Sequence, residues 1–584
     1  MRKISLLFIL FLPTIVFSQD FNFDLYKSNE THTYESITEG YRQLEKSYPK
    51  KCKLIEMGSS DVGEPIHLFV INASGNFEKS DFKGKTVLFV NNAIHPGEPC
   101  GVDASIKWCR DILQEVPEDV VIGVIPMYNV GGALNRNCCS RANQNGPKMY
   151  GFRGNSRNLD LNRDFIKADS KNTLAFYKAY HFLEPHLFVD THTSNGADYQ
   201  HVMTLITSQI DKMNFHLAKY TREKINPELY NQMDESGFKM VPYVHQIKST
   251  PDDGIMDYLE TPRYSTGYTN LFHTISYVSE AHMLKTYEER VEATYAFLNV
   301  LYEFAKVNGD EIRKVKMQAE YSMGQTERLA LNWELDTVRY DQIKFMGYAA
   351  KYKKSEVTGK DRLYYDRDAP YTKDIKYFNR YKAVDTVDVP ALYLIPQAWG
   401  EIIELMLYSN VEVMRLTKDK EIETEHYRIK EFNTRPNPYE GHYLHSQVKV
   451  EKFKKNTLWR KGDYVIFTRN KNLRFIVETL EPHAPDSYLA WNYFDAILQQ
   501  KEWFSSYVFE DEAAQILKDN PEIKAEFEQK KLNDEEFASS TFAQLYYLYQ
   551  KSGHYEPTHN LYPVGRLMIE DVMADEIEEV PGIY

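Results

Sequence analysis

Four short apolar runs, separated by amphipathic segments, most strongly constrain how this chain folds. The runs lie at 86–90, 120–125, 186–189 and 274–278. Helix-like segments follow at 101–113 and 173–182, and Thr286 with Glu289 forms a capping box before a further helix. Apolar strands that alternate with such helices predict an α/β domain, with a mixed, mainly parallel sheet flanked by helices.

The second half of the chain has a different pattern. With 584 residues the chain is too long for one core, so we expect separate domains. The α/β domain should span 19–310, and the charged segment 311–330 should be a linker or helix. Short alternating runs predict a β-rich accessory domain over 331–480, interrupted by a helix at 399–408. Residues 481–584 are predicted to form a helical C-terminal region packed on that domain.

The N-terminus has the composition of a secretory signal peptide. A basic start, 1–3, precedes an apolar run over 4–17. This run is too short to span a membrane comfortably, so 1–18 is predicted to be a signal peptide and the protein to be secreted or periplasmic. The formal net charge of −14 argues against nucleic-acid binding, and no later segment predicts a membrane span.

All five cysteines lie in the first quarter of the chain: Cys52, Cys100, Cys109, Cys138 and Cys139. An odd number in an exported protein allows at most two bridges and leaves one thiol. Their spacing differs from that of a cysteine zinc site. We therefore interpret them as structural, with their pairing open.

A His-x-x-Glu motif, from His95 to Glu98, directly follows the first apolar run. The same spacing occurs at 32–35 and 181–184, so the motif alone is weak evidence for a metal site. Only His95 and Glu98 follow a predicted buried strand, in a loop shaped by proline and glycine. Ligands of an open parallel sheet bind at the carboxyl ends of its strands, which favours a metal site at this pair.

Two further candidates follow later strands. His192 comes just after the third run, and two histidines with one carboxylate at one sheet edge are typical of a catalytic zinc site. Asp190 either orients the His192 imidazole or caps the loop. Glu280 ends the fourth run, where it can take a proton from a zinc-bound water and pass it to the leaving amine. The alternative for Glu280 is an ion pair with Arg290 or Lys285.

The segment 158–165 reads Asn-Leu-Asp-Leu-Asn-Arg-Asp-Phe and contains the pair Asn162 and Arg163. An arginine guanidinium matches a carboxylate bidentately, so such a pair beside a zinc site can hold the terminal carboxylate of a peptide. The alternative is a surface loop in which Arg163 pairs with Asp160 or Asp164.

In this order, the four features resemble the zinc carboxypeptidases related to carboxypeptidase A, over roughly residues 35–305. The resemblance implies a carboxypeptidase-like fold and one Zn²⁺ per chain. It implies that the zinc ligands are His95, Glu98 and His192. Glu280 would be the general base and acid, and Asn162 with Arg163 would bind the terminal carboxylate of the substrate.

The family also uses an arginine upstream of the Asn-Arg pair to polarise the scissile carbonyl. Arg153 is the best match in this chain, with Arg157 and Arg141 as alternatives.

A mobile tyrosine of the family closes over the substrate. We assign this role to Tyr268, with Tyr258 and Tyr264 also available. The segment that sets side-chain preference would lie near 252–258.

The predicted function is hydrolysis of a peptide bond near the C-terminus of a peptide or peptidoglycan-type substrate. An aspartoacylase-like amidohydrolase resembles the same motif set, but those enzymes are compact and intracellular, so the predicted signal peptide favours a peptidase. A third hypothesis is an inactive peptidase fold kept for binding. Such a protein would not need to retain all three ligands and Glu280.

Overall fold

The computed structural model describes residues 21–568 and 576–583. The predicted signal peptide, 1–18, lies outside the described residues. Among the residues that are described, no helix has the length and apolar character needed to cross a membrane.

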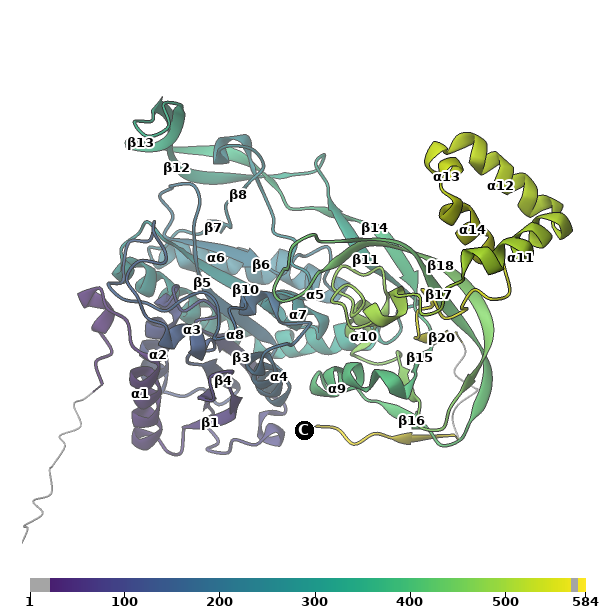
Figure 1. The fold of residues 1–584 in the computed structure, drawn as a ribbon. Helices are drawn as coiled ribbons and strands as arrows, with labels where there is room; N and C mark the ends of the chain where they lie inside the picture. The colour runs from purple at the N-terminus through teal and green to yellow at the C-terminus, as the bar shows by residue number, and fades with distance from the viewer. Residues whose placement is uncertain (1–20, 569–575, 584) are drawn as a thin grey trace, which may run out of the picture.

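An eight-stranded mixed sheet forms the centre of the first half of the chain (Figure 1). Its strand order is β1-β2-β4-β3-β5-β10-β6-β7. The strands are β1 (Cys52–Ser59), β2 (Pro65–Ile71), β3 (Thr86–Asn91), β4 (Val120–Ile125), β5 (Leu187–Ser194), β6 (Met203–Thr207), β7 (Val241–Pro242) and β10 (Ile275–His282). The neighbours β4, β3, β5 and β10 run parallel, whereas β1–β2, β2–β4 and β10–β6 pair antiparallel. The four predicted apolar strands are β3, β4, β5 and β10, and the predicted fold class is confirmed.

Helices cover both faces of this sheet. They are α1 (Tyr34–Ser47), α2 (Cys100–Ile112), α3 (Val130–Leu134), α4 (Lys171–Leu183), α5 (Phe215–Tyr220), α6 (Asn226–Glu235), α7 (Ser265–Leu271) and α8 (Tyr287–Met323). Successive side chains of a strand point to opposite faces. Phe188 of β5 therefore packs against Phe176 of α4, while Thr191 lies against Gly101 of α2. Helix α8 packs against α2 on that second face.

The long helix α8 connects the two halves of the chain. It starts at the predicted capping box of Thr286 and Glu289 and ends at Met323, with a kink at Asn308. Four residues separate the end of this helix from strand β11 (Arg328–Leu335). The segment 311–330, expected as a linker or helix, is therefore mostly the last part of α8.

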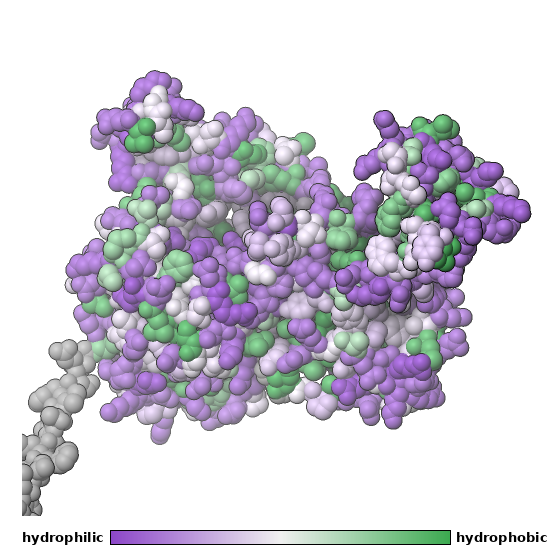
Figure 2. Space-filling view, viewed as in Figure 1, coloured by the Kyte–Doolittle hydropathy of each residue, from purple (hydrophilic) through white to green (hydrophobic). Residues whose placement is uncertain are grey.

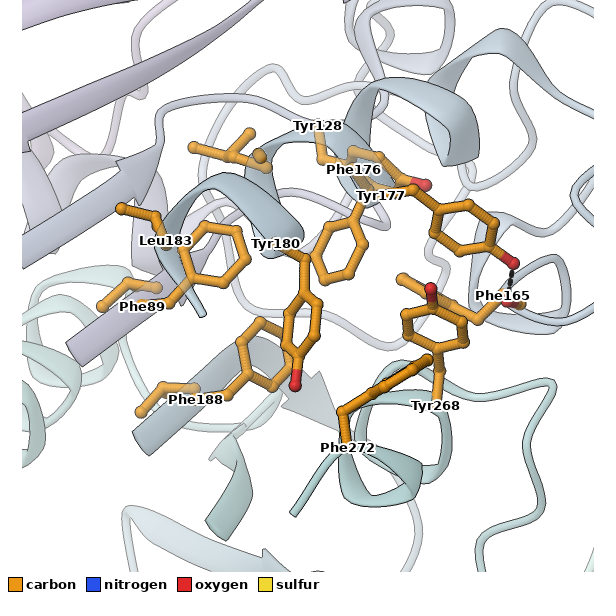
Figure 3. Packing of buried hydrophobic residues seen from close by; sticks show 14 of the residues in the cluster. Phe89, Tyr128, Phe165, Phe176, Tyr177, Tyr180, Leu183, Phe188, Tyr268 and Phe272 are labelled. Carbon is orange, nitrogen blue, oxygen red and sulfur yellow. Dashed lines mark hydrogen bonds between the residues drawn. The ribbon is translucent and has the colours of Figure 1, made fainter. Parts of the chain in front are cut away.

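An aromatic cluster fills the space between the sheet and helices α4 and α7 (Figure 3). Its members include Phe89, Phe165, Phe176, Tyr177, Tyr180, Phe188, Tyr268 and Phe272. The rings of Tyr177 and Tyr268 stack with centroids 4.6 Å apart. Burying one side chain of this size contributes about 1.5–3 kcal/mol. The cluster therefore holds α4 and α7 firmly against the sheet, and α7 begins at the site described below.

The second half is rich in β structure, as predicted. A seven-stranded sheet has the order β18-β17-β20-β15-β19-β16-β21. Its strands are β15 (Leu392–Ile395), β16 (Met414–Leu416), β17 (Lys420–Thr434), β18 (His445–Trp459), β19 (Tyr464–Phe467), β20 (Gly565–Leu567) and β21 (Ile577–Glu579). Helices α9 (Gly400–Tyr408) and α10 (Leu473–Leu480) belong to the same region, and β11 pairs with β14 (Tyr381–Asp388).

The C-terminal segment differs from the prediction for 481–584. Helices α11 (Ser506–Asp519), α12 (Pro521–Asn533), α13 (Glu535–Ser539) and α14 (Thr541–Tyr549) form a projecting unit with its own small core (Figure 1). After this unit the chain returns to the sheet as β20 and β21. The segment is therefore not only helical. Strands this short carry too little pattern to be recognised without the partners that they pair with.

A long hairpin ties the two halves together. It consists of β12 (Asp341–Lys354) and β13 (Asp361–Phe378), and β13 pairs with β9 (Ile255–Met256), which pairs with β8 (His245–Gln246). The hairpin and the α11–α14 unit project from the same side of the molecule, and the surface between them is concave (Figure 2).

The five cysteines form one bridge, between the adjacent residues Cys138 and Cys139. Cys52, Cys100 and Cys109 are free and buried. This pairing is one bridge fewer than the sequence allows.

Candidate metal centre

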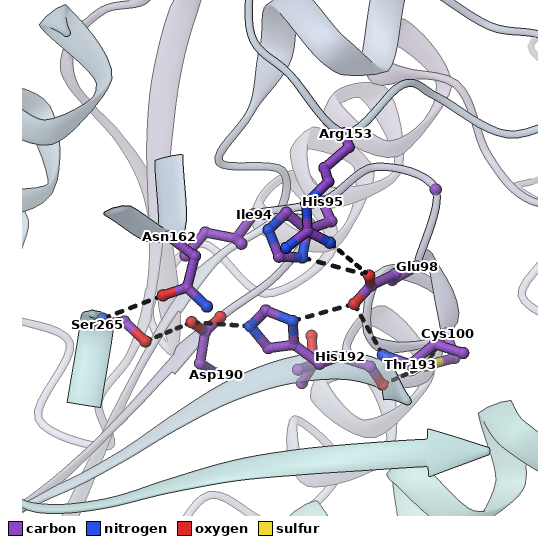
Figure 4. Close-up of polar contacts among 12 residues, drawn as sticks. Ile94, His95, Glu98, Cys100, Arg153, Asn162, Asp190, His192, Thr193 and Ser265 are labelled. Carbon is purple, nitrogen blue, oxygen red and sulfur yellow. Dashed lines mark hydrogen bonds and ion pairs between the residues drawn. The ribbon is translucent and has the colours of Figure 1, made fainter. Parts of the chain in front are cut away.

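His95, Glu98 and His192 meet at the carboxyl ends of β3 and β5 (Figure 4). The Glu98 carboxylate lies 3.0 Å from Nδ1 of His192 and 3.3 Å from Nδ1 of His95. One candidate ligand atom from each residue lies within 4.8 Å of the others, and all three residues are buried. Since β3 and β5 are adjacent parallel strands, the loop after one and the end of the other reach the same sheet edge.

The residues at this point fit a zinc ion. Nδ1 of His95 is buried and has no hydrogen-bond partner among the residues that the structure describes, which is costly unless another group satisfies it. Two imidazoles and one carboxylate form the ligand set of a catalytic zinc site, which keeps a fourth position open. The opposite nitrogens of both rings face carboxylates, Asp160 at 2.9 Å from His95 Nε2 and Asp190 at 3.2 Å from His192 Nε2. Such carboxylates orient the ligand imidazoles.

Asp160 and Asp190 are themselves held by donors. Asp190 accepts hydrogen bonds from the Ser265 hydroxyl at 2.5 Å and from the Asn91 amide at 3.3 Å. Burial alone would raise the pKa of Asp160, but His95 and nearby arginines hold it well below its ordinary value. Asp160 is therefore an anion in the folded protein. Of the two roles considered for Asp190, the structure favours orientation of the imidazole.

Glu280 lies beside this cluster on the neighbouring strand. β10 pairs with β5 so that Glu280 is in register with His192. Its Oε2 is buried and accepts no hydrogen bond from the described part of the chain, and burial raises the pKa of Glu280 to about 7. Neither of the alternative partners pairs with it, because Lys285 donates to the Tyr199 carbonyl and Arg290 to the carbonyls of the 145–146 segment. A carboxyl group with a pKa near neutrality suits proton transfer.

Two of the three candidate arginines face the site. Arg153 contacts Glu98 Oε1 at 3.4 Å and donates from Nε to Asp160 at 3.0 Å. Arg141 donates to the same Glu98 oxygen at 2.6 Å. Both line a cavity of about 220 Å³ that also contains the three candidate ligands and Glu280. Arg157 instead binds the Asp169 carbonyl outside this cavity.

Asn162 and Arg163 line the same cavity. They lie in a short helical turn (Leu161–Arg163) that Asp160 caps through the Asn162 N–H at 2.9 Å. The Arg163 guanidinium lies over the Tyr264 ring, 4.5 Å from its centre, in a cation–π contact that helps to fix its position. The alternative was a local salt bridge between Arg163 and Asp160. Their charged atoms are 4.0 Å apart, which is too long for a strong ion pair.

The tyrosine assignment needs a correction. Tyr268 is fully buried in the aromatic cluster, where its hydroxyl group contacts His181 and Ser409, and it does not line the cavity. Tyr258 and Tyr264, the two other candidates, do line it. Helix α7 turns Tyr268 toward α4 and away from the metal cluster, a direction that the sequence alone does not indicate.

The residues that sequence reasoning missed include a cavity residue, Tyr243, and a positioning residue, Asn129. Tyr243 also lines the cavity. Asn129, fully buried at the start of α3, donates to the carbonyls of Ile94 at 3.1 Å and Arg153 at 3.0 Å. It thereby joins the loop of His95 to the loop of Arg153. The available signal was the position of Asn129, four residues after the carboxyl end of the second apolar run.

A model of the zinc carboxypeptidase family matches residues 37–329, the part of the chain that contains every residue of this site. The chain belongs to the zinc carboxypeptidase family. The predictions of family and of enzyme class are therefore confirmed, and the zinc carboxypeptidase described here is a metallopeptidase.

Individual relatives are distant. Carboxypeptidase 2 of Trichophyton tonsurans is 20% identical over 456 residues, covering 74% of this chain and 78% of the relative, and its counterpart in Trichophyton equinum gives the same values. A metallo-carboxypeptidase structure from Burkholderia cenocepacia has 14% identity and a TM-score of 0.36, over 48% of this chain and 70% of that one. Carboxypeptidase A from Helicoverpa armigera has 13% identity and a TM-score of 0.34, over 50% and 74%.

Proposed function

We propose that this zinc carboxypeptidase removes the C-terminal residue of peptides, using one Zn²⁺ held by His95, Glu98 and His192. The observation that carries the proposal is the shared cavity, in which the three candidate ligands, Glu280 and Arg163 lie together. A metal site, a base and a carboxylate-binding arginine within about 220 Å³ are the groups that cleavage next to a terminal carboxylate requires.

Each group has a distinct task in the proposed reaction. Arg163 and Asn162 hold the terminal carboxylate and so place the last peptide bond beside the metal cluster. A bound zinc ion would polarise the carbonyl and lower the pKa of a water molecule. Glu280 takes the proton of the attacking water and returns it to the leaving amine. Arg153 donates to the oxygen of the scissile carbonyl as negative charge develops there.

We further infer that the enzyme is exported and meets peptides or peptidoglycan-type peptides outside the cytoplasm. The support is the basic and apolar pattern of residues 1–18. Fractionation of the native host with an antibody to the chain tests this inference, and recovery in the cytoplasmic fraction alone would contradict it.

The decisive test replaces Glu280 with glutamine. Glu280→Gln should retain one zinc per chain and lose about 10²–10⁴-fold in kcat, because a positioned acid–base group contributes that much. Metal analysis and peptide hydrolysis measure the two effects. The exposed Glu288 provides the matched control, and Glu288→Gln should behave as wild type. Undiminished turnover in Glu280→Gln would remove this residue from the mechanism.

A second experiment tests the metal ligands and the substrate class. His192→Ala should lose stoichiometric zinc. The wild-type enzyme should cleave acylated dipeptides with a free carboxylate and leave the matching C-terminal amides almost intact. N-acyl amino acids serve as the comparison for an amidohydrolase. Preference for those over dipeptides would contradict the proposed function.

A further inference from the structure

A loop of the second half of the chain reaches the metal centre. It is the connection between β17 and β18, residues 435–444. Within it, the Glu440 carboxylate accepts a hydrogen bond of 2.7 Å from the backbone N–H of Asp160. Asp160 is the residue whose side chain contacts His95 Nε2, Arg153 Nε and the Asn162 N–H, at 2.9, 3.0 and 2.9 Å.

The loop is held in place by several other contacts. His442 Nε2 lies 2.9 Å from the carboxylate of Asp169 in the segment after Arg163. The Tyr439 ring stacks on Trp491 at a centroid distance of 6.1 Å, and the Arg263 guanidinium lies over the Tyr439 ring at 5.6 Å. Contacts from both halves of the chain thus fix the position of the loop relative to the segment that carries Asp160.

Glu440 itself has a strained backbone. Its φ of +51° lies in the left-handed region, which costs a residue other than glycine free energy and persists only where the surroundings impose it. The residue sits in a tight turn closed by reciprocal hydrogen bonds between Tyr439 and His442. Its half-buried carboxylate is directed to Asp160, and burial raises its pKa.

We propose that Glu440 is a positioning residue of the metal centre, contributed by the C-terminal region. By fixing the backbone of Asp160, it aims one carboxylate at the ligand His95, at Arg153 and at the turn of Asn162. The proposal rests on the function proposed above for these residues. It also gives residues 435–444 a role: they complete the active site, so the α/β domain alone holds an incompletely oriented centre.

The test uses the full chain and three substitutions at one position. Glu440→Ala removes the acceptor, Glu440→Met removes it while keeping side-chain length, and Glu440→Gln keeps a carbonyl oxygen that can accept the N–H. The matched control is Glu431→Ala, because Glu431 is exposed on β17 and forms a surface ion pair with Lys449, at 2.6 Å. Zinc affinity by chelator competition, thermal unfolding, kcat and KM are measured for each.

We expect Glu440→Ala and Glu440→Met to bind zinc about tenfold more weakly, since outer contacts of ligand residues typically change metal affinity by about 10–100-fold. Their kcat should fall about tenfold with KM changed less than about twofold, because Arg153 donates to the reacting carbonyl and His95 holds the metal ion that would polarise it. Glu440→Gln should recover most of both values, and Glu431→Ala should match wild type.

Two results would overturn the proposal. One is zinc affinity and kcat in Glu440→Met equal to those of Glu431→Ala. The other is an equal loss in all three Glu440 variants that follows their loss of thermal stability, which would show a purely structural contact. If the wild-type protein binds zinc but cleaves no peptide, the proposed function fails. The positioning role would still be supported in that case if Glu440→Met binds zinc more weakly and Glu440→Gln recovers the affinity.

Discussion

The Asp160 carboxylate serves three neighbours at once. One of its oxygens contacts both the His95 imidazole and the Asn162 N–H, and the other accepts from Arg153. A neutral amide cannot match this arrangement, because one of its two terminal atoms is a donor and it lacks the charge that the histidine and the arginine face.

Asp160→Asn should therefore weaken zinc binding about 10–100-fold, the usual range for a partner of a ligand histidine. It should also reduce kcat/KM, because Arg153 loses its anchor. Chelator competition and peptide hydrolysis measure the two effects, with Asp234→Asn, half-exposed on α6, as the control. Unchanged zinc affinity would contradict the orienting role of Asp160.

The remaining cavity wall predicts substrate preference. Away from the metal cluster the lining combines neutral polar residues with five apolar or aromatic ones, namely Ile206, Tyr243, Tyr258, Tyr264 and Val278. The acids in the cavity lining are Glu98 and Glu280, both assigned to the metal centre, whereas its arginines repel cations.

Peptides ending in Phe or Leu should be cleaved at least about tenfold faster than those ending in Lys or Arg, in a matched series assayed for kcat/KM. A preference for basic ends would show that an unassigned acid faces the substrate.

At the scale of elements, the site depends on how closely α2 approaches β5. Gly101 of α2 leaves no room for a side chain, because a Cβ there would lie 1.9 Å from Oγ1 of Thr191. Thr191 directly precedes His192 on β5 and donates to the Asn92 side chain at 2.9 Å. The helix, the strand and the ligand loop therefore share one tightly packed contact.

Gly101→Ala should destabilise the protein by about 1–3 kcal/mol, the typical cost of overpacking a core. Denaturant unfolding measures the free energy of unfolding. Gly553→Ala is the matched control, since nothing lies within 4 Å of a Cβ at that position. A stability equal to that of the control would mean that α2 can move away from β5 at little cost.

At the scale of the whole molecule, buried neutral histidines join distant segments. His201 donates from Nδ1 to the Lys239 carbonyl at 2.9 Å, and its Nε2 accepts the Met346 N–H of the β12–β13 hairpin at 3.1 Å. His282 likewise uses both ring nitrogens, with the Ala197 carbonyl and the Leu284 N–H. A second proton on either ring would face an N–H donor.

Stability should therefore fall as the pH is lowered. Burial depresses the pKa of His201 from 6.5 to about 4, so the unfolded chain takes up this proton first. The stabilisation that neutral His201 provides is fully present above pH 6.5 and is lost as the pH falls toward 4. At about pH 4.5 the free energy of unfolding should be lower by about 2–3 kcal/mol. His201→Gln should show a flatter pH dependence in denaturant unfolding, and exposed His554→Gln should not. Parallel curves for wild type and His201→Gln would contradict this account.

Much of the catalytic half could be predicted because its signals are local. The strands at 86–90 and 120–125 are almost wholly apolar, as expected for strands buried on both faces. The C-terminal half was predicted only in outline, since the short strands β20 and β21 depend on partners far along the chain. Local pattern holds no information about such pairing.

The candidate ligands and the candidate base can be found from local pattern, because His95, Glu98, His192 and Glu280 lie at the ends of strand-like runs, and parallel strands bring their carboxyl ends to one edge. The side chains that surround them follow from the folded arrangement. It buries Tyr268, turns Arg141 toward Glu98 and brings Glu440 to Asp160. Those outcomes come from packing between segments up to 280 residues apart, and side-chain direction at such contacts is set by the folded neighbours rather than by adjacent residues.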